Sequence, residues 1–254
     1  MSSELFRLDG KRALVTGASR GLGAAMAEAL AGAGADVAVH GNTRPPEETR
    51  QRVEGLGRRA VSLVGDLGDR GFALGLVDQA AAALGGLDIL VNNAGTIRRA
   101  PAADHPDGDW EAVLGVNLTA VFLLARAAGR RFLAGKQPGK IINVASLLSF
   151  QGGVTVPGYA AAKGGVAQLT KALANEWAAS GINVNAIAPG YMSTDNTEAL
   201  RNDPVRSRQI LERIPAGRWG APADLAGAAV FLAAPASDYV HGHVLVVDGG
   251  WLGR

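Results

Sequence analysis

The sequence predicts one α/β domain in which a parallel sheet carries helices on both faces. Short apolar runs rich in valine, isoleucine and alanine alternate with longer Ala- and Leu-rich segments from Arg12 to Val247. The short runs are continuously apolar, which is typical of strands buried on both faces of a sheet. Strict alternation of strand and helix implies right-handed crossovers and a doubly wound sheet. With 254 residues, 48% of them hydrophobic, the chain suits a single domain spanning 1–254.

The apolar runs, and the glycine and polar residues between them, locate each element. Strands are expected at residues 12–16, 35–40, 60–64, 88–91, 140–145, 182–188 and 243–247. Helices are expected at residues 21–33, 69–84, 109–133 and 157–179. The stretch 193–213 is polar and irregular. It lies within a segment, 191–220, that follows the sixth strand, where such folds place substrate-covering loops or helices.

Composition and charge exclude several classes of function. The formal net charge is +2 and no block of like charges occurs, so we expect no nucleic-acid partner. No run of about 18 apolar residues lacks a charge, so we expect no membrane span. The chain has no cysteine, which excludes disulfides and thiolate catalysis and fits a cytoplasmic location. His241 and His243 alternate on an expected strand but lack a third ligand, so we expect no metal.

A glycine-rich loop follows the first expected strand and opens the first expected helix. Glycines in this place permit a tight turn and let a pyrophosphate approach the helix N-terminus, where free N–H groups favour anions. The spacing is GxxxGxG, and alone it would indicate only an ordinary turn. Its position between strand and helix favours dinucleotide binding. The loop residues assigned to this role are Gly17, Ser19, Arg20, Gly21, Leu22 and Gly23.

Loops after three other strands extend the predicted dinucleotide site. Asn42 follows the second strand, and Asp66 and Leu67 follow the third. The Asp66 carboxylate could accept from an adenine amino group, or it could instead cap the next helix. After the fourth strand come the small residues of a further loop, Asn93, Ala94 and Gly95. The carboxyl ends of parallel strands meet at one edge of the sheet, so the sequence predicts a Rossmann-type site for NAD(P)(H) there.

A second set of polar residues predicts proton-transfer chemistry. Tyr159 and Lys163 lie four residues apart on one expected helix and therefore share a face. Ser146 stands 13 residues before the tyrosine, just after the fifth strand, and Asn117 lies within an expected helix. A free phenol is a poor acid or base at neutral pH, but a neighbouring ammonium lowers its pKa. Tyr159 could then exchange a proton with a substrate oxygen that Ser146 holds.

Taken together, the glycine loop, Asn-Asn-Ala-Gly, and the four polar residues resemble the short-chain dehydrogenase/reductase family over nearly the whole chain. The resemblance implies the strand order 3-2-1-4-5-6-7, seven strands and a homotetramer. It implies that Tyr159 is the acid/base, Lys163 its activator and a ligand of the cofactor ribose, Ser146 the orienting hydroxyl and Asn117 the support of a proton-relay water. It also adds three residues of the loop after the sixth strand to the cofactor site: Pro189, Gly190 and Thr194.

Within that family, five segments resemble enzymes that oxidise or reduce sugar acids of the 3-deoxy-hexulosonate and 2-deoxy-gluconate type. The segments are residues 149–153, 174–177, 188–192, 213–220 and 248–252. An arginine suits a substrate carboxylate. The candidate substrate residues are Arg98, Gln151, Tyr191, Arg218 and Trp219, although these could also be surface charges or packing residues. The alternatives are a 3-oxoacyl thioester reductase of the same superfamily and a non-catalytic dinucleotide-sensing protein.

Different features of the sequence favour NAD and NADP as the cofactor. An NAD enzyme usually carries an acidic residue at the end of the second strand, and none occurs between Val39 and Asn42. Arg20 and Arg44 could face a 2′-phosphate, which favours NADP. The sugar-acid resemblance instead favours NAD. We therefore expect both cofactors to be accepted, with a preference of no more than roughly tenfold to a hundredfold.

Overall fold

Seven parallel strands form one sheet in the order β3-β2-β1-β4-β5-β6-β7, which confirms the expected topology. The computed structural model describes residues 4–254. The strands are β1 (Arg12–Val15), β2 (Asp36–Gly41), β3 (Ala60–Val64), β4 (Ile89–Asn92), β5 (Gly139–Val144), β6 (Ile182–Pro189) and β7 (Val244–Val247). Each lies within one or two residues of its predicted position, because each is a short apolar run that ends at polar or glycine residues.

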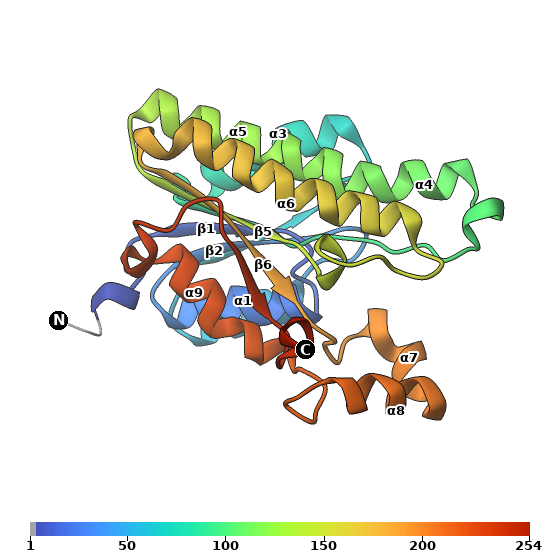
Figure 1. Ribbon diagram of the computed structural model, residues 1–254. Coiled ribbons are helices and arrows are strands. Elements are labelled where there is room, and N and C mark those ends of the chain that lie inside the picture. Colours follow the sequence, from blue (N-terminus) through green and yellow to red (C-terminus); the bar gives the residue numbers. More distant parts are fainter. Residues whose placement is uncertain (1–3) are drawn as a thin grey trace.

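Helices cover both faces of the sheet (Figure 1). One face carries α1 (Gly21–Gly32), α2 (Glu47–Gly55) and α9 (Ala226–Ala233). The other face carries α3 (Arg70–Leu84), α4 (Asp107–Leu114), α5 (Ala120–Gly135) and α6 (Pro157–Trp177). The short helices α7 (Glu198–Asn202) and α8 (Pro204–Arg213) project beside the C-terminus, beyond the end of β6.

Alternate residues of the central strands supply the two apolar layers of the core. Val15 of β1 and Val39 of β2 pack toward α1 and α9. Leu14 and Leu90 pack toward α3 and α5. All four side chains are fully buried, as the continuous apolar runs predict for a sheet covered on both faces.

Four parts of the chain differ from the sequence-based expectations, and one of them is α9, a short apolar helix that was not predicted. The expected helix at 109–133 is two helices, α4 and α5, joined by a π-helical turn at Gly115–Thr119. Continuous apolar composition conceals such a one-turn change of pitch. The stretch 193–213 contains α7 and α8 and is therefore not irregular. Helix α2 went unpredicted because it buries only Thr49 and Val53 and shows little apolar periodicity.

The helical stretch Asp107–Gly135 is long and apolar enough to cross a membrane by length and composition alone. Half of its most apolar window is buried in this fold. Its second half, α5, packs Leu124 and Ala128 into the core between α3 and the sheet. A core helix passes the same test, so we interpret the stretch as part of the core.

Candidate active site

A cleft of about 420 Å³ lies along the carboxyl ends of the strands. It brings together loops that are far apart in the sequence, as expected at the switch point of a doubly wound sheet. The predicted cofactor residues that line it are Gly17, Arg20, Gly21, Leu22, Gly23, Asn42, Asp66, Leu67, Asn93, Ala94, Gly95, Tyr159, Lys163, Pro189, Gly190 and Thr194. Ser19 is the exception; its hydroxyl lies 3.5 Å from the carbonyl of Arg44.

The glycine loop forms a cradle that side chains would fill. A Cβ on Gly23 would stand 2.2 Å from the carbonyl oxygen of Gly17, and Gly17 itself adopts a φ of +62°. Asn93 anchors the loop from β4, since its amide donates to the carbonyls of Thr16 and Gly17 at 2.8 and 3.0 Å. No side chain caps the N-terminus of α1. Its N–H groups are therefore available to a pyrophosphate, and the site fits an NAD(P) dinucleotide.

At the other end of the cleft, the loops after β2 and β3 supply Asn42 and Asp66. Asp66 is not the cap of α3; that role belongs to Asp69, which accepts from the N–H groups of Gly71 and Phe72. The Asp66 carboxylate instead accepts from the N–H of Gly68 at 2.8 Å and lines the cleft. The structure therefore favours the binding interpretation of Asp66.

Tyr159, Lys163 and Ser146 meet at the middle of the cleft. Helix α6 begins at Pro157 and brings Tyr159 and Lys163 onto one face, with the ammonium 5.6 Å from the phenol ring centroid. The Lys163 ammonium donates to the carbonyl of Val144 at 2.6 Å. Burial lowers the pKa of Lys163 to about 8. Burial raises the pKa of Tyr159, whereas the Ser146 hydroxyl and the charge of Arg99 lower it.

Asn117 lies in the π-helical turn between α4 and α5 and is fully buried. Its side-chain oxygen accepts from the N–H of Thr96 at 2.8 Å, and its amide donates to the carbonyl of Thr96 at 2.8 Å. Both polar groups of the side chain therefore hold the loop after β4. Thr96 in turn lines the cleft, so Asn117 shapes the site through this loop.

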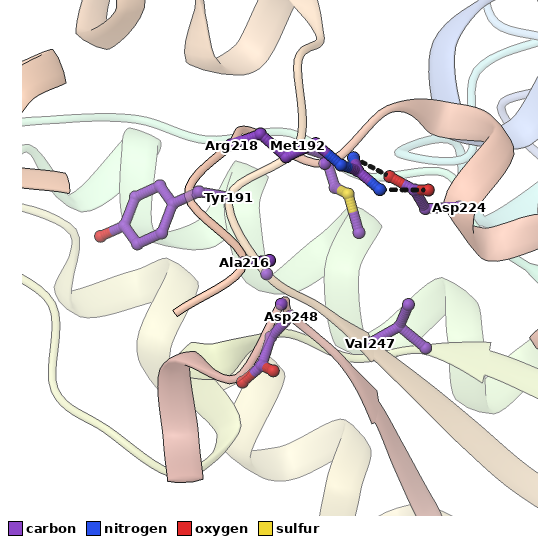
Figure 2. Close-up of a pocket in the computed structure, with 10 residues that line it drawn as sticks. Tyr191, Met192, Ala216, Arg218, Asp224, Val247 and Asp248 are labelled. Atoms are coloured by element: carbon purple, nitrogen blue, oxygen red, sulfur yellow. Dashed lines mark hydrogen bonds and ion pairs between the residues drawn. The ribbon is translucent and has the colours of Figure 1, made fainter. Parts of the chain in front are cut away.

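None of the five predicted substrate residues lines this cleft. Tyr191 and Arg218 line a second pocket of about 240 Å³, which adjoins the cleft through the shared residues Gly190 and Met192. In this pocket the Arg218 guanidinium makes two contacts, at 2.6 and 2.9 Å, with Asp224 (Figure 2). Trp219 packs edge-on against Tyr191. Gln151 accepts a hydrogen bond from the indole of Trp251 at 3.1 Å. These side chains pack the segment after β6 against the C-terminal residues.

Two neighbouring arginines after β4 have different surroundings. Arg98 hydrogen-bonds Thr96 and lies 3.4 Å from the carboxylate of Asp109. Arg99 donates to the carbonyl of Asn196, a residue that lines the cleft, at 3.5 Å. Within residues 4–254, no carboxylate lies within ion-pair distance of Arg99. Its charge is therefore available at the side of the cleft that holds Tyr159.

Sequence reasoning missed several residues that line the cleft. They are His40, Thr96, Val116, Val144, Ala145, Met192, Asp195, Asn196 and Thr197. Four of them come from the first turns of the segment 191–220, so that segment does border the cleft. His40 is a polar residue at the end of an apolar strand, and that position was the available signal.

Comparison with known proteins identifies the family. Residues 17–252 match a family model described as enoyl-(acyl carrier protein) reductase. The chain is 54% identical to the 2-dehydro-3-deoxy-D-gluconate 5-dehydrogenase of Escherichia coli K12, covering 98% of each. A structure from Agrobacterium tumefaciens, described as a 2-deoxy-D-gluconate 3-dehydrogenase with bound NADP, is 56% identical with a TM-score of 0.93, covering 98% of this chain and 99% of that one.

A gluconate 5-dehydrogenase from Burkholderia cenocepacia, solved with NADP and tartrate, is 42% identical over 100% of both chains, with a TM-score of 0.94. The range matched by the family model, residues 17–252, includes the glycine loop, the Tyr159–Lys163 helix and the segment after β6. The chain therefore belongs to the short-chain dehydrogenase/reductase family and is an NAD(P)-dependent oxidoreductase.

Proposed function

We propose that this oxidoreductase interconverts a secondary alcohol and a ketone on a sugar acid of the 3-deoxy-hexulosonate or 2-deoxy-gluconate class. The observation that carries the proposal is an arginine without a carboxylate partner, Arg99, which donates to the carbonyl of the cleft-lining Asn196 and whose charge lowers the pKa of the Tyr159 phenol. Such a group suits the carboxylate of a sugar acid. The activity named for the E. coli relative supports the same substrate class.

In this proposal, Tyr159 is the proton carrier. In the direction of oxidation its phenolate takes the proton of the substrate hydroxyl, and in the reverse direction the phenol returns it. NAD(P) supplies the hydride acceptor or donor when it is bound. Ser146 donates a hydrogen bond to the reacting oxygen and stabilises its developing charge. The ammonium of Lys163 favours the phenolate and can also hold the cofactor ribose.

Asn117 has a narrower role than its side chain suggested. Its side-chain amide and oxygen both hydrogen-bond Thr96, which leaves one amide N–H and one lone pair of the oxygen for a relay water. The π-helical turn that contains it is a feature frequent at functional sites.

The candidate substrate arginine is Arg99 and not Arg98 or Arg218. Arg98 and Arg218 already lie beside Asp109 and Asp224, and a substrate carboxylate would have to displace these partners. Arg99 contacts only a carbonyl, that of Asn196. Asn196 belongs to the segment 191–220, which we propose covers the substrate. A carboxylate bound to Arg99 would therefore also draw this segment over the cleft.

The test of substrate class is turnover on a panel of sugar acids with both cofactors. A 3-deoxy-hexulosonate or 2-deoxy-gluconate should be converted with a kcat/KM at least tenfold above that of neutral sugars and of 3-oxoacyl thioesters. Preference for the thioester would identify the alternative reductase. Cofactor binding without turnover of any substrate would identify a dinucleotide-sensing protein, and either result would overturn the proposal.

The test of Arg99 uses its neighbour as the matched control. Arg99→Ala should raise KM for the acid by roughly tenfold to a hundredfold, the worth of a charged hydrogen bond, and change KM for a neutral analogue much less. Arg98→Ala removes the same charge from the adjacent residue and should alter KM for the acid less than threefold. If the two variants raised KM for the acid equally, neither arginine would be the ligand of the substrate carboxylate.

We also propose a homotetramer. Trp110, Phe122 and Leu133 are large apolar side chains that remain exposed along α4 and α5. Exposed apolar surface of this kind marks interaction sites. Light scattering should give four times the chain mass of 26.0 kDa. The double variant Phe122→Glu with Leu133→Glu should give a smaller species, and an unchanged mass would place the interface elsewhere.

We further propose a cytoplasmic location. The lack of cysteine in all 254 residues is compatible with a reducing compartment such as the cytoplasm, where NAD(P) is available. Fractionation of cells that produce the protein should recover its activity with the cytoplasmic fraction. Recovery with the membrane or the periplasm would contradict this location.

A further inference from the structure

His40, the penultimate residue of β2, bridges two loops of the cofactor cleft. Its Nδ1 accepts a hydrogen bond from the N–H of Gly17 at 3.3 Å. Its Nε2 lies 2.9 Å from the carbonyl of Gly65, to which it donates. The side chain is almost fully buried, yet it lines the cleft. One ring therefore connects the glycine loop after β1 with the loop after β3.

The bridge completes a clamp on the first glycine of the loop. Strand β1 lies between β2 and β4 in the sheet. From the β4 side, Asn93 donates to the carbonyl of Gly17 at 3.0 Å. From the β2 side, His40 accepts from the N–H of the same residue. A side chain on Gly17 is excluded, because its Cβ would stand 2.8 Å from Ala94. Both polar groups of Gly17 are thus held by the neighbouring strands.

We infer that His40 is a positioning residue of the cofactor site, which fixes the separation between the loop for the pyrophosphate and the loop that carries Asp66. Only a neutral imidazole with its proton on Nε2 can accept from Gly17 and donate to Gly65 at once. Phe72 of α3 holds the plane of the ring, with centroids 5.7 Å apart. The inference depends on cofactor binding and not on the identity of the substrate.

The charge state of the ring follows from its surroundings. Burial lowers the pKa of His40 from its ordinary value of 6.5, while the Gly65 carbonyl and the charge of Asp66 oppose this. Phe72 adds no charge, and Arg20, further along the glycine loop, is paired with Asp195. Protonation of Nδ1 in acid would turn the acceptor for Gly17 into a donor and separate the ring from the glycine loop.

Two substitutions of His40 test its hydrogen bonds to Gly17 and Gly65 separately. His40→Gln can place an amide near Nε2 and donate to Gly65, but offers no acceptor to Gly17. His40→Asn can accept from Gly17 but does not reach Gly65. Each should weaken NADH binding at pH 7.5 by roughly three- to tenfold, the cost of one hydrogen bond. Each should raise KM for the cofactor while kcat stays within twofold. His243→Gln, on an exposed histidine, is the matched control.

The pH dependence of cofactor binding separates positioning from a loss of folding. NAD⁺ is the probe, because it has no 2′-phosphate that titrates in the same range. The Kd of the wild type for NAD⁺ should rise as pH falls. The midpoint of this rise should coincide with the pH at which ¹⁵N NMR shows the His40 ring to titrate. Both variants should lose the pH dependence of Kd. A charged or Nδ1-protonated His40 at pH 7.5 would overturn the inference, as would variants that bind NADH like the wild type and keep its pH dependence.

Discussion

The guanidinium of Arg20 lies 2.7 Å from the carboxylate of Asp195, and this ion pair joins the glycine loop to the segment after β6. Both residues line the cofactor cleft. Arg20 is the arginine that the sequence assigns to a 2′-phosphate, so Asp195 competes with that phosphate for it. Arg44, the other predicted phosphate ligand, does not line the cleft. We therefore expect the preference for NAD or NADP to depend on this pair.

Asp195→Asn should shift the enzyme toward NADP. The two side chains are mostly exposed, with 76% and 58% of their surface accessible, and such pairs contribute less than about 1 kcal/mol. Freeing Arg20 should therefore raise the ratio of kcat/KM for NADP to that for NAD by roughly two- to fivefold. Steady-state kinetics with each cofactor measures the ratio.

A double variant supplies the control for this prediction. In the Arg20→Ala background, Asp195→Asn should leave the NADP-to-NAD ratio unchanged, because there is no guanidinium to release. An equal shift in both backgrounds would show that Asp195 acts on the cofactor directly. A preference of the wild type for NAD above about a thousandfold would show that Arg20 does not contact the phosphate at all.

Tyr159→Phe should lower kcat by roughly a hundredfold or more, the scale of general acid/base catalysis, with little change in cofactor Kd. The variant removes the hydroxyl and keeps the ring that packs beside Lys163. Tyr239→Phe is the matched control, because that side chain is almost completely exposed. Near-normal turnover by the Tyr159 variant would assign proton transfer to another group.

The sequence predicts the sheet well because strand order and position depend on local patterns. The run Ala60–Val64 matches its observed strand at both ends, since apolar residues begin and stop there. The predicted cofactor residues other than Ser19 line the cleft, because glycine and small residues must follow particular strands for a dinucleotide to approach them, and their binding of the cofactor stays a prediction. Both the strand positions and the cleft-lining loops could be predicted because they depend on local composition.

The sequence predicts the substrate side poorly because it depends on tertiary partners. Arg98, Arg99 and Arg218 look alike as residues, and only the fold shows that the first and third lie beside Asp109 and Asp224. The two hydrogen bonds of His40 likewise come from loops on either side of its own strand. No spacing in the chain indicates such contacts.

Lys163→Met should stabilise the fold near pH 7 while abolishing activity. Burial lowers the pKa of Lys163 from 10.5 to about 8, a difference that corresponds to about 3 kcal/mol. The unfolded chain binds more protons than the folded one between about pH 8 and 10.5. Stability from this group therefore rises with pH across that window, and below it the folded state carries the full cost of a buried charge.

Urea denaturation measures this effect. The Met variant should exceed the wild type by about 1 to 3 kcal/mol at pH 7, and the difference should shrink as pH rises toward 10.5. Lys171→Met, an exposed lysine of the same helix, should show neither the gain nor the pH dependence. A Met variant less stable than the wild type at pH 7 would mean that the bond to Val144 outweighs the cost of burial.

Trp251 links the C-terminal residues to the segment that borders the cleft. Trp251 and Leu252 are apolar residues that could either take part in a subunit contact or pack locally. In the structure Trp251 is buried against its own chain, 4.6 Å from the ring of Tyr191 and 4.0 Å beneath the guanidinium of Arg213. These contacts favour local packing over a role in assembly.

Trp251→Ala should therefore lower the free energy of unfolding by about 3 kcal/mol, the usual cost of truncating a buried aromatic side chain. Because Tyr191 and Arg213 belong to the segment after β6, the same variant should raise KM for the substrate more than it lowers kcat. Trp251→Phe keeps the ring but not the hydrogen bond to Gln151, and should recover most of the stability. Light scattering of Trp251→Ala should give an unchanged mass. If Trp251→Ala formed a smaller species with the stability of the wild type, Trp251 would belong to a subunit interface, and the interpretation as local packing would be wrong.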